Sequence, residues 1–411
     1  MVKKAKEFPL LILMINMFVA MTGIGLIIPI MPTIVQEFGA GGKTFGFMIA
    51  TFALAQFIFS PFAGDLSDRV GRKKTIVTGL IIFALSQVIF GISQQLWLLY
   101  ISRLLGGMGA AFMIPSMMAY VADITTMDNR AKGMGRLGAA MSLGFVIGPG
   151  IGGFLAEFGL RVPFFVAGAV AGSSAVISMI FLPETRDLDS LSKQSPAGEK
   201  RDRLLKQLIQ SVTKPYFVLL IMMFTLSFGL ANFQSTISLF SDIKFGFRPI
   251  DISLLMVTGG LIGVIVQAFL LERVLRRFGE IPVMNTMLVV AAVSMLGLLM
   301  AQGFWSILFI SSFFFTAASL LRPAINTLVS KMAGEEQGFA AGMNNAYMSI
   351  GNMVGPAIAG TLFDINMGIP YVFGAAIIFS TLLISISWAK KRKAKGGKYS
   401  RMGYKVQSCD Y

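Results

Sequence analysis

Long apolar runs separated by short polar segments organise the whole chain. From Leu10 to Trp388 such a run recurs about every 30 to 40 residues, and many runs are long enough to cross a bilayer as a helix of about 20 residues. They are continuously apolar and do not alternate, which excludes a β-barrel. The pattern predicts an all-α membrane protein with twelve transmembrane helices, at 8–36, 45–66, 75–94, 97–122, 133–157, 162–182, 215–240, 251–272, 281–300, 304–331, 338–363 and 370–389.

One long polar segment, 183–214, separates the first six predicted helices from the last six. It is rich in charge, serine and proline, as expected of a cytoplasmic linker. Its part from 199 to 212 either forms a helix on the membrane surface or belongs to a flexible tether. The expected organisation is a six-helix bundle over 1–182, the linker, a second six-helix bundle over 215–389 and a basic cytoplasmic tail over 390–411.

Composition narrows the class of protein further. The 411 residues are 55% hydrophobic and 13% charged, with a mean hydropathy of +0.74, whereas soluble proteins carry about 25% charged residues. Twelve spans leave no stretch of about 100 residues for an extramembrane domain. A soluble enzyme with a membrane anchor is therefore excluded.

The net charge of +15 is distributed unevenly over the predicted loops. With both termini inside, 29 lysines and arginines lie in inside segments and 4 in outside segments, as the positive-inside rule requires. The positive net charge is explained by basic loops that face anionic lipid headgroups, and no nucleic-acid partner is expected. Arg103 and Arg322 are the two remaining basic residues, and both fall within predicted helices.

Chemistry based on cysteine or histidine is excluded. Cys409 in the basic tail is the single cysteine, and the chain contains no histidine. Disulfides, the usual metal ligands and the usual proton shuttle are therefore missing, and we expect no metal and no cofactor. The apolar stretch after MVKKAKEF is too long for a signal peptide and is interpreted as the first helix.

The two halves of the chain resemble each other. Residues 144–153 read GFVIGPGIGG and residues 351–360 read GNMVGPAIAG, an offset of 207. Residues 68–74 read DRVGRKK and residues 272–278 read ERVLRRF, an offset of 204. Duplicated six-helix halves indicate a transporter whose site lies at the interface between them.

The loop after the second predicted helix carries a charged motif, GDLSDRVGRKK, at 64–74. Its carboxylates and arginines can form charge-assisted pairs that make and break during a conformational change. Alternatively, it is a generic basic loop. The order of residues resembles the signature of the major facilitator superfamily, and this resemblance implies a cytoplasmic gating latch built from Asp65, Asp68, Arg69 and Arg72.

The glycine- and proline-rich run of the fifth helix resembles the motif of antiporters in that superfamily. Small residues allow close helix packing, and a proline removes a backbone hydrogen bond. These features serve either helix packing alone or a gate. The resemblance implies gating roles for Gly144, Gly148, Pro149 and Gly153.

Further segments extend the resemblance over nearly the whole chain: GIGLIIPIMPTI (23–34), SRLLGGMGAAFMIP (102–115), LRPAINT (321–327) and GTLFD (360–364). Together they resemble the NorA/Bmr-type multidrug efflux proteins of Gram-positive bacteria. The resemblance implies proton-driven export of amphipathic, often cationic drugs such as fluoroquinolones and dyes across a bacterial plasma membrane. We expect a monomer whose partners are small-molecule drugs, protons and the lipid bilayer.

Polar residues inside membrane helices mark the place to look for function. Arg103 either reaches the outer interface or faces a central cavity, and each of the polar residues either links helices or lines that cavity. Phenylalanine and methionine suit varied ligands. The candidate substrate-binding residues are Phe52, Gln56, Arg103, Met141, Phe145, Asn232, Gln234, Phe315, Ser319, Arg322, Asn344 and Tyr347.

One departure from the resembled family concerns proton coupling. Such proteins carry a carboxylate in the seventh helix and another in the tenth, where this chain has Gln234 and Ser319. The acids of this sequence fall at helix ends or in loops. Either an end-located acid such as Asp123 or Glu157 titrates, or the coupling ion or the substrate differs.

Two other functions remain open. A transporter of the same fold could move a specific metabolite, lipid or metallophore with a different coupling ion, and transport of a dye and quinolone panel would separate the two. A membrane-embedded enzyme is the weaker alternative, because histidines, a metal cluster and paired intramembrane carboxylates are lacking.

Overall fold

The structure, a computed structural model, describes the backbone of residues 2–185 and 206–401 and the side chains of 7–185 and 206–390. Over this part of the chain the regular elements are helices, without a strand. They are α1 (Val2–Gly25), α2 (Met31–Glu37), α3 (Gly42–Val70), α4 (Arg72–Ile92), α5 (Leu96–Ile124), α6 (Met127–Ala156), α7 (Val162–Phe181), α9 (Phe217–Phe245), α10 (Pro249–Ile265), the π-helical turn η2 (Val266–Leu270), α11 (Leu271–Phe278), α12 (Glu280–Gly297), the 3₁₀ turn η3 (Leu298–Met300), α13 (Phe304–Ala333), α14 (Gln337–Ile365) and α15 (Ile369–Arg401).

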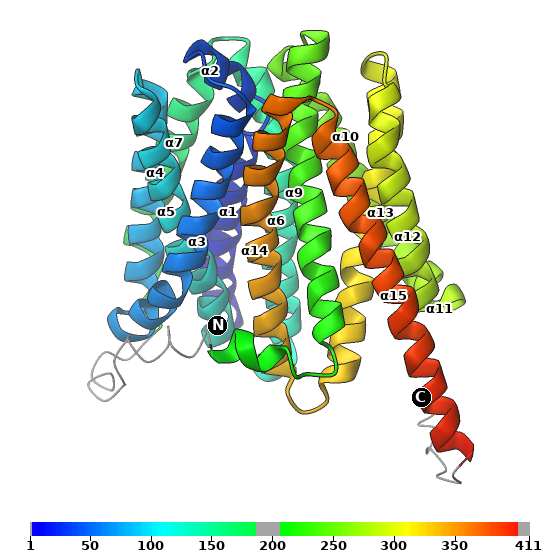
Figure 1. Cartoon of the computed structure of the whole chain (residues 1–411). Helices are drawn as coiled ribbons and strands as arrows, with labels where there is room; N and C mark the ends of the chain where they lie inside the picture. Colours follow the sequence, from blue (N-terminus) through cyan, green and yellow to red (C-terminus); the bar gives the residue numbers. More distant parts are fainter. Residues whose placement is uncertain (1, 186–205, 402–411) are drawn as a thin grey trace.

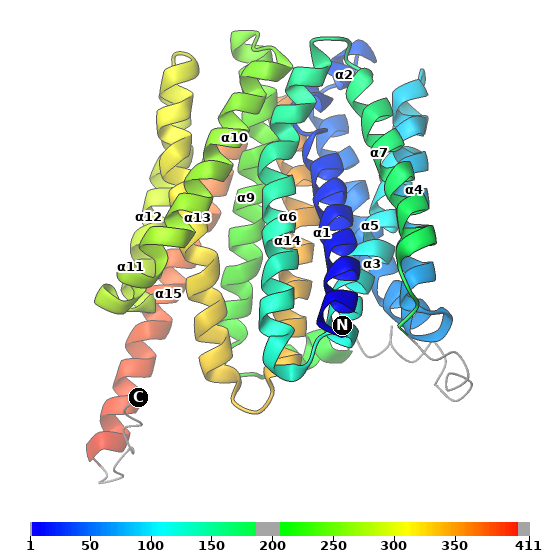
Figure 2. The same ribbon diagram turned by 180° about the vertical axis from the view of Figure 1, so that it is seen from behind.

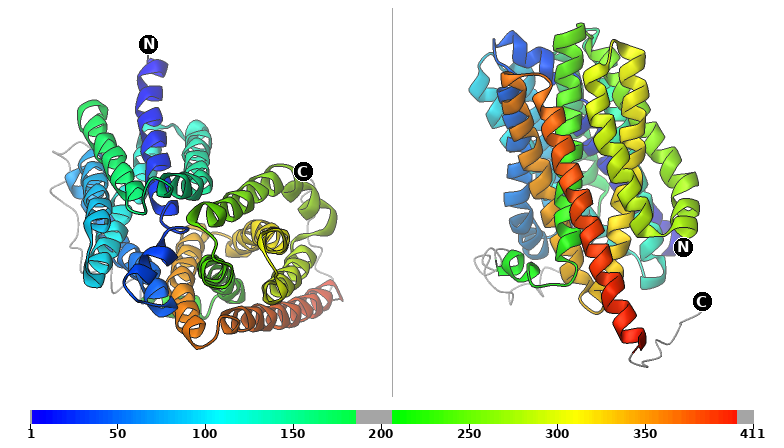
Figure 3. Two further views of the ribbon diagram at one scale, coloured as in Figure 1. Left: turned by 90° about the horizontal axis from the view of Figure 1, so that it is seen from above. Right: turned by 45° about the vertical axis from the view of Figure 1, so that its right-hand side comes forward.

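The long helices stand side by side, and the described helices that begin and end the chain, α1 and α15, reach the same end of the bundle (Figure 1). We call this the terminal end and the opposite one the distal end. Seen from above, α1 to α7 gather on one side and α9 to α15 on the other (Figure 3). Across this boundary α3 packs on α14 and α6 packs on α10 (Figure 2).

The expected all-helical membrane fold with twelve helices is confirmed. Eleven helices within the described residues are long and apolar enough to cross a membrane. The twelfth, α14, is less apolar than these eleven helices because it carries Gln337, Asn344, Asn345 and Asn352. It has the same length of 29 residues as α3 and lies among the spanning helices (Figure 1).

The prediction of one helix over 8–36 is wrong. Helix α1 ends at Gly25, a turn occupies residues 26–30, and α2 begins at Met31. Pro29 and Pro32 explain the break, because each lacks a backbone donor and disfavours helical geometry in the residue before it. Pro32 is accommodated in the first turn of α2, where the missing donor costs nothing.

The second half continues its helix further than expected. The eighth helix was expected to end near 272, but η2 and α11 carry the helical chain to Phe278. Gly71 and Gly279, with positive φ angles of 110° and 78°, mark the turns into α4 and α12. These glycines lie 208 positions apart, so the repeat register at this loop is 208 and not the 204 of the motif match.

Part of the linker is also helical. Residues 206–211 form a short helix that precedes α9. They belong to the segment 199–212 for which a surface helix or a tether was expected, and the rest of that prediction lies outside the described residues.

Candidate functional site

The first glycine-proline motif packs α6 against two neighbours. A Cβ added at Gly144 would lie 2.5 Å from the carbonyl oxygen of Phe18, and one added at Gly148 would lie 2.8 Å from that of Thr22, both on α1. Gly153 faces the other half instead, where an added Cβ would overlap the hydroxyl of Ser253 on α10. Only glycine allows backbones to approach this closely.

The second motif repeats this arrangement on α14. A Cβ added at Gly351 would lie 2.6 Å from the carbonyl oxygen of Phe224 on α9, within the same half. One added at Gly360 would meet the carbonyl oxygen of Gly42, on α3 of the other half. In both repeats the early glycines therefore pack inside a half and the last glycine packs across the boundary.

Polar contacts join the two halves at the distal end. The carboxylate of Asp364 accepts hydrogen bonds from the backbone N–H groups of Gly42 at 2.6 Å and Lys43 at 2.8 Å. The side chain of Gln36 donates to Asp242 at 2.8 Å. A carboxylate on the first turn of α3 is favourable because the helix dipole is positive there. The distal end is thus held closed by both packing and hydrogen bonds.

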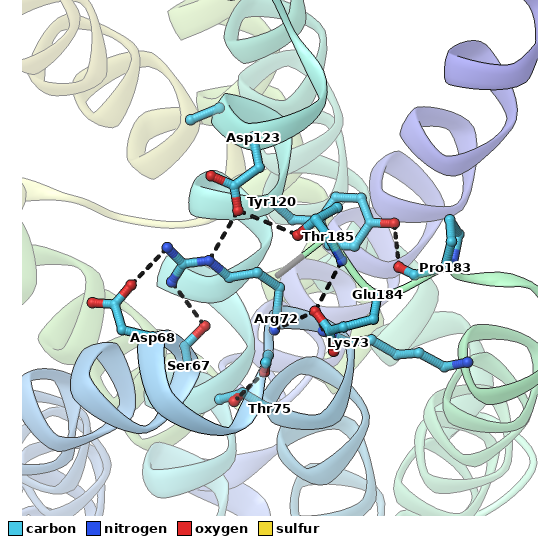
Figure 4. Close-up of polar contacts among 12 residues, drawn as sticks. Ser67, Asp68, Arg72, Lys73, Thr75, Tyr120, Asp123, Pro183, Glu184 and Thr185 are labelled. Atoms are coloured by element: carbon cyan, nitrogen blue, oxygen red, sulfur yellow. Dashed lines mark hydrogen bonds and ion pairs between the residues drawn. The ribbon is translucent and has the colours of Figure 1, made fainter. Parts of the chain in front are cut away.

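The charged motif forms a compact cluster at the terminal end (Figure 4). The guanidinium of Arg72 lies 2.7 Å from Asp68 and 3.1 Å from Asp123, and it donates to the hydroxyl of Ser67 at 3.0 Å. Its side chain is 8% exposed. The structure therefore brings together Asp68 and Arg72, as the gating interpretation requires, and adds Asp123 from α5.

The predicted gating residues Asp65 and Arg69 lie on the same helix end. Asp65 is buried, whereas Arg69 is exposed. Gly144, Gly148 and Gly153 lie in the packing contacts described above, and Pro149 would be 3.1 Å from a Cβ added at Gly25.

Sequence reasoning missed Glu184, which follows α7. Its carboxylate accepts the backbone N–H of Arg72 at 2.8 Å and that of Lys73 at 3.4 Å, in the first turn of α4. Thr185 donates its hydroxyl to Asp123 at 3.2 Å (Figure 4). The start of the linker is thereby fixed to the charged cluster. A glutamate three residues after the end of α7, behind Leu182 and Pro183, was the available signal.

The far end of the linker is fixed to the second half. The hydroxyl groups of Ser211 and Tyr347 lie 2.9 Å apart. Lys214 donates to Glu336 at 2.6 Å, and this hydrogen bond lowers the pKa of the Glu336 carboxyl below its ordinary value. Tyr347, expected to contact substrate, thus joins α14 to the linker.

A second ion pair repeats the cluster with its charges exchanged. Glu280 at the start of α12 lies 2.5 Å from Lys331 near the end of α13. These residues follow Arg72 and Asp123 by 208 positions each, and their helices correspond. The halves therefore share the position of the pair and differ in its polarity.

Several predicted substrate residues lie on α3, α6, α9 and α13, and most are half-buried, whereas Phe315 is 8% exposed. Phe315 packs over Gly259 of α10 and meets the ring of Phe233 edge-on at 5.7 Å between centroids. Ser319 and Arg322 follow Phe315 by four and seven residues, so the three share one face of α13. The others in this group are Phe52, Gln56, Met141 and Gln234, together with Phe145, which is exposed.

Arg103 is buried inside the first half. Its side chain is 4% exposed, and its guanidinium lies 4.6 Å above the ring of Phe90, which stacks on Phe164. Its Nε has no hydrogen-bond partner among the described residues. Phe90 and Phe164 lie near the distal ends of α4 and α7, so Arg103 packs toward that end and is enclosed by protein. The choice between the outer interface and a cavity stays a prediction.

Two predicted substrate residues serve as links between helices. Asn232 is 0% exposed, and its amide donates to the carbonyl oxygen of Pro370 on α15 at 3.4 Å. Asn344 donates to Asn326 on α13 at 3.0 Å. Packing against α15 encloses the Asn232 side chain in this structure, and its role in substrate binding stays a prediction.

The described residues offer no metal site. They contain no group of three or more histidine, cysteine, aspartate or glutamate side chains that could hold an ion. The carboxylates of the described spans lie near helix ends, as with Asp123, Asp128, Asp242 and Asp364.

Comparison with known proteins gives consistent matches. The family model described as Major Facilitator Superfamily matches residues 13–280 and 219–403. The chain is 43% identical to Multidrug resistance protein 2 of Bacillus subtilis over 382 residues, covering 93% of this chain and 95% of that protein. It is 35% identical to the Quinolone resistance protein NorA of Staphylococcus aureus over 385 residues, covering 93% and 97%.

Solved structures agree in fold. A bacterial homolog of the human lysosomal transporter Spinster, in an inward-facing and occupied conformation, superposes with a TM-score of 0.71 at 17% identity. The match covers 93% of this chain and 95% of that one. This likeness supports the twelve-helix fold.

Proposed function

Because this chain belongs to the major facilitator superfamily, we propose that it exports amphipathic drugs, such as quinolones and dyes, across a bacterial plasma membrane by alternating access. The observation that carries the proposal is the 43% identity to a multidrug resistance protein over nearly the whole length of both chains. A match of this extent covers both halves and both glycine-proline motifs. The chain is a membrane transporter and not an enzyme.

The packing at the distal end supports the alternating-access part of the proposal. Both repeats place their last motif glycine, Gly153 and Gly360, in backbone contact with the opposite half. Such contacts have two discrete states, packed or separated, as a gate needs. The positive-inside rule puts the termini in the cytoplasm. In that orientation the closed distal end faces the outside, which supports a state that accepts substrate from the cytoplasm.

Proton exchange, which the family resemblance implies, is the finer part of the proposal. Its carrier would be an end-located acid, and the two candidates are ion-paired: Asp123 with Arg72 at 3.1 Å and Glu157 with Arg248 at 3.5 Å. Protonation of Asp123 would remove one partner of Arg72 and loosen the terminal-end cluster. This gives a route by which a proton could act on the gate.

Accumulation of a panel of dyes and quinolones in cells that lack their own efflux pumps tests the proposal. Cells that express the chain should retain less of several unrelated amphipathic compounds than control cells. Equal retention of the whole panel, at equal amounts of protein in the membrane, would favour the transporter of one specific metabolite, lipid or metallophore.

A further inference from the structure

Arg322 is a cation in the middle of a membrane-spanning helix. It is the nineteenth of the 30 residues of α13, which puts it about 5 Å from the helix midpoint at about 1.5 Å per residue. From there an arginine side chain cannot reach either membrane surface as easily as one near a helix end. It is half-buried and shares the face of α13 that carries Phe315 and Ser319.

No carboxylate compensates this charge. Within the described residues, no hydrogen bond or ion pair reaches the guanidinium of Arg322. The face of α13 that carries Phe315 and Ser319 packs on α10, where Cβ atoms added at Gly259 and Gly263 would meet the Phe315 ring and the Ser319 hydroxyl. Ser319, one turn before Arg322, is neutral, so no described residue of this contact offsets the positive charge.

Arg103 adds a second intramembrane guanidinium without a carboxylate. It contacts the ring of Phe90 and, at 3.5 Å, the hydroxyl of Ser102. The carboxylates of the described spans lie toward their ends. The interior of the bundle is therefore electropositive, and a charge buried without a partner is costly until an opposite charge arrives.

We propose that the substrates of this transporter carry an anionic group, a carboxylate or sulfonate, which binds to the guanidinium of Arg322 during transport. The proposal rests on the proposed export function and specifies its substrate class. A guanidinium presents a planar fork of donors that matches these two-oxygen groups. The apolar part of the substrate then packs against the neighbouring aromatic face at Phe315.

The negative charge of a net anionic substrate also removes the need for a protein group that binds and releases a proton during transport. A membrane potential of 100 mV, negative inside, favours outward movement of one negative charge by a factor of about 50. The potential alone can thus drive export of a monoanion. Neutral side chains at Gln234 and Ser319 are compatible with such a mechanism.

Transport of a matched dye pair in proteoliposomes tests the substrate class. Rhodamine 110 carries a free carboxylate, and rhodamine 123 is its methyl ester and a monocation. The wild type should transport rhodamine 110 in preference, and Arg322→Gln should reduce that preference about tenfold or more, the loss expected for a hydrogen bond to a charged group. Arg277→Gln, which removes an exposed charge on α11, is the matched control and should change nothing.

Two more variants keep the test decisive if Arg322→Gln fails to fold. Arg322→Lys should retain part of the preference, because it keeps the charge and loses the planar fork. Ser319→Glu places a carboxylate three residues from Arg322, within pairing distance on a helix, and should reverse the preference toward rhodamine 123. An unchanged preference in either Arg322→Gln or Ser319→Glu, with folded protein, would overturn the proposal.

Other outcomes separate this proposal from the function it rests on. If the wild type transports rhodamine 123 as well as or better than rhodamine 110, the anionic class is wrong and drug export stands. If the wild type transports neither dye nor any quinolone, drug export itself is wrong. For the driving force, sulforhodamine 101, a net monoanion, should leave vesicles whose interior is made negative with valinomycin and a potassium gradient, and a requirement for a pH gradient would contradict this.

Discussion

Gly46 and Pro356, from opposite halves of the molecule, lie in backbone contact: a Cβ added at Gly46 would come within 2.1 Å of the carbonyl oxygen of Pro356. The contact joins α3 to α14 near the distal end, beside the hydrogen bond from the Gly42 N–H to Asp364. No side chain fits at position 46 in this closed arrangement. The size of the side chain at position 46 therefore determines whether α3 and α14 can pack together and close the distal end.

Replacing Gly46 by leucine should therefore prevent closure of the distal end. We expect loss of transport with normal amounts of protein in the membrane, and a longer distance between spin labels at Lys43 and Asn366, measured by pulsed electron resonance. Gly172→Leu on α7 is the control, since an added Cβ there meets nothing within 4 Å. An unchanged label distance in Gly46→Leu would show that the contact does not limit closure.

The two ion pairs related by the repeat should differ in energy. Arg72 is 8% exposed beside two carboxylates, and removing one partner from a buried pair costs about 3 kcal/mol or more. Lys331 is 59% exposed, and such surface pairs contribute about 1 kcal/mol or less. In detergent, Arg72→Ala should lower the thermal unfolding temperature clearly more than Lys331→Ala. Equal shifts would mean that the cluster around Arg72 adds no more stability than the exposed pair.

Topology can be read from single cysteines in a Cys409→Ser background. Lys43, Gln302 and Asn366 are exposed at the distal end, and cysteines there should react with a membrane-impermeant thiol reagent in intact cells. A cysteine at Gln194, in the linker, should react only after permeabilisation. Reaction at position 194 in intact cells would contradict the cytoplasmic orientation of both termini.

Gln234→Glu should shift substrate preference toward monovalent cations. At an effective dielectric constant of about 20, a carboxylate about 4 Å from an ammonium contributes about 4 kcal/mol of attraction before desolvation is subtracted. The amide of Gln234 can only hydrogen-bond. Comparing ethidium with a zwitterionic quinolone in wild type and variant measures the shift, and identical ratios would show that residue 234 does not contact substrate.

Much of the fold was predictable because membrane-spanning helices are recognisable in a sequence by their length and hydropathy. The glycine-proline motifs were equally informative, since close backbone contact requires glycine wherever the partner lies. Pro29 and Pro32 indicated the break after Gly25. The continuous apolar pattern around them nevertheless led to the prediction of one helix. Hydropathy alone cannot distinguish one long helix from two that share an apolar environment.

The candidate site was less predictable because a polar residue in a span can face a pathway or another helix. Asn232 and Gln234 are two positions apart on α9, yet Asn232 packs against α15 while Gln234 is half-buried. Only the packing of neighbouring helices decides between them. Glu184 shows the same limit, since its role depends on the backbone of α4, more than 100 positions away.

The most direct test of drug transport by alternating access is substrate counterflow in proteoliposomes. Vesicles loaded with a high concentration of unlabelled norfloxacin are diluted into a trace of labelled norfloxacin, without any ion gradient. A carrier that exposes one site alternately to each side should accumulate label transiently above its equilibrium level, and Gly46→Leu should abolish this overshoot. Label that only approaches equilibrium, at the rate of protein-free vesicles, would contradict drug transport by alternating access.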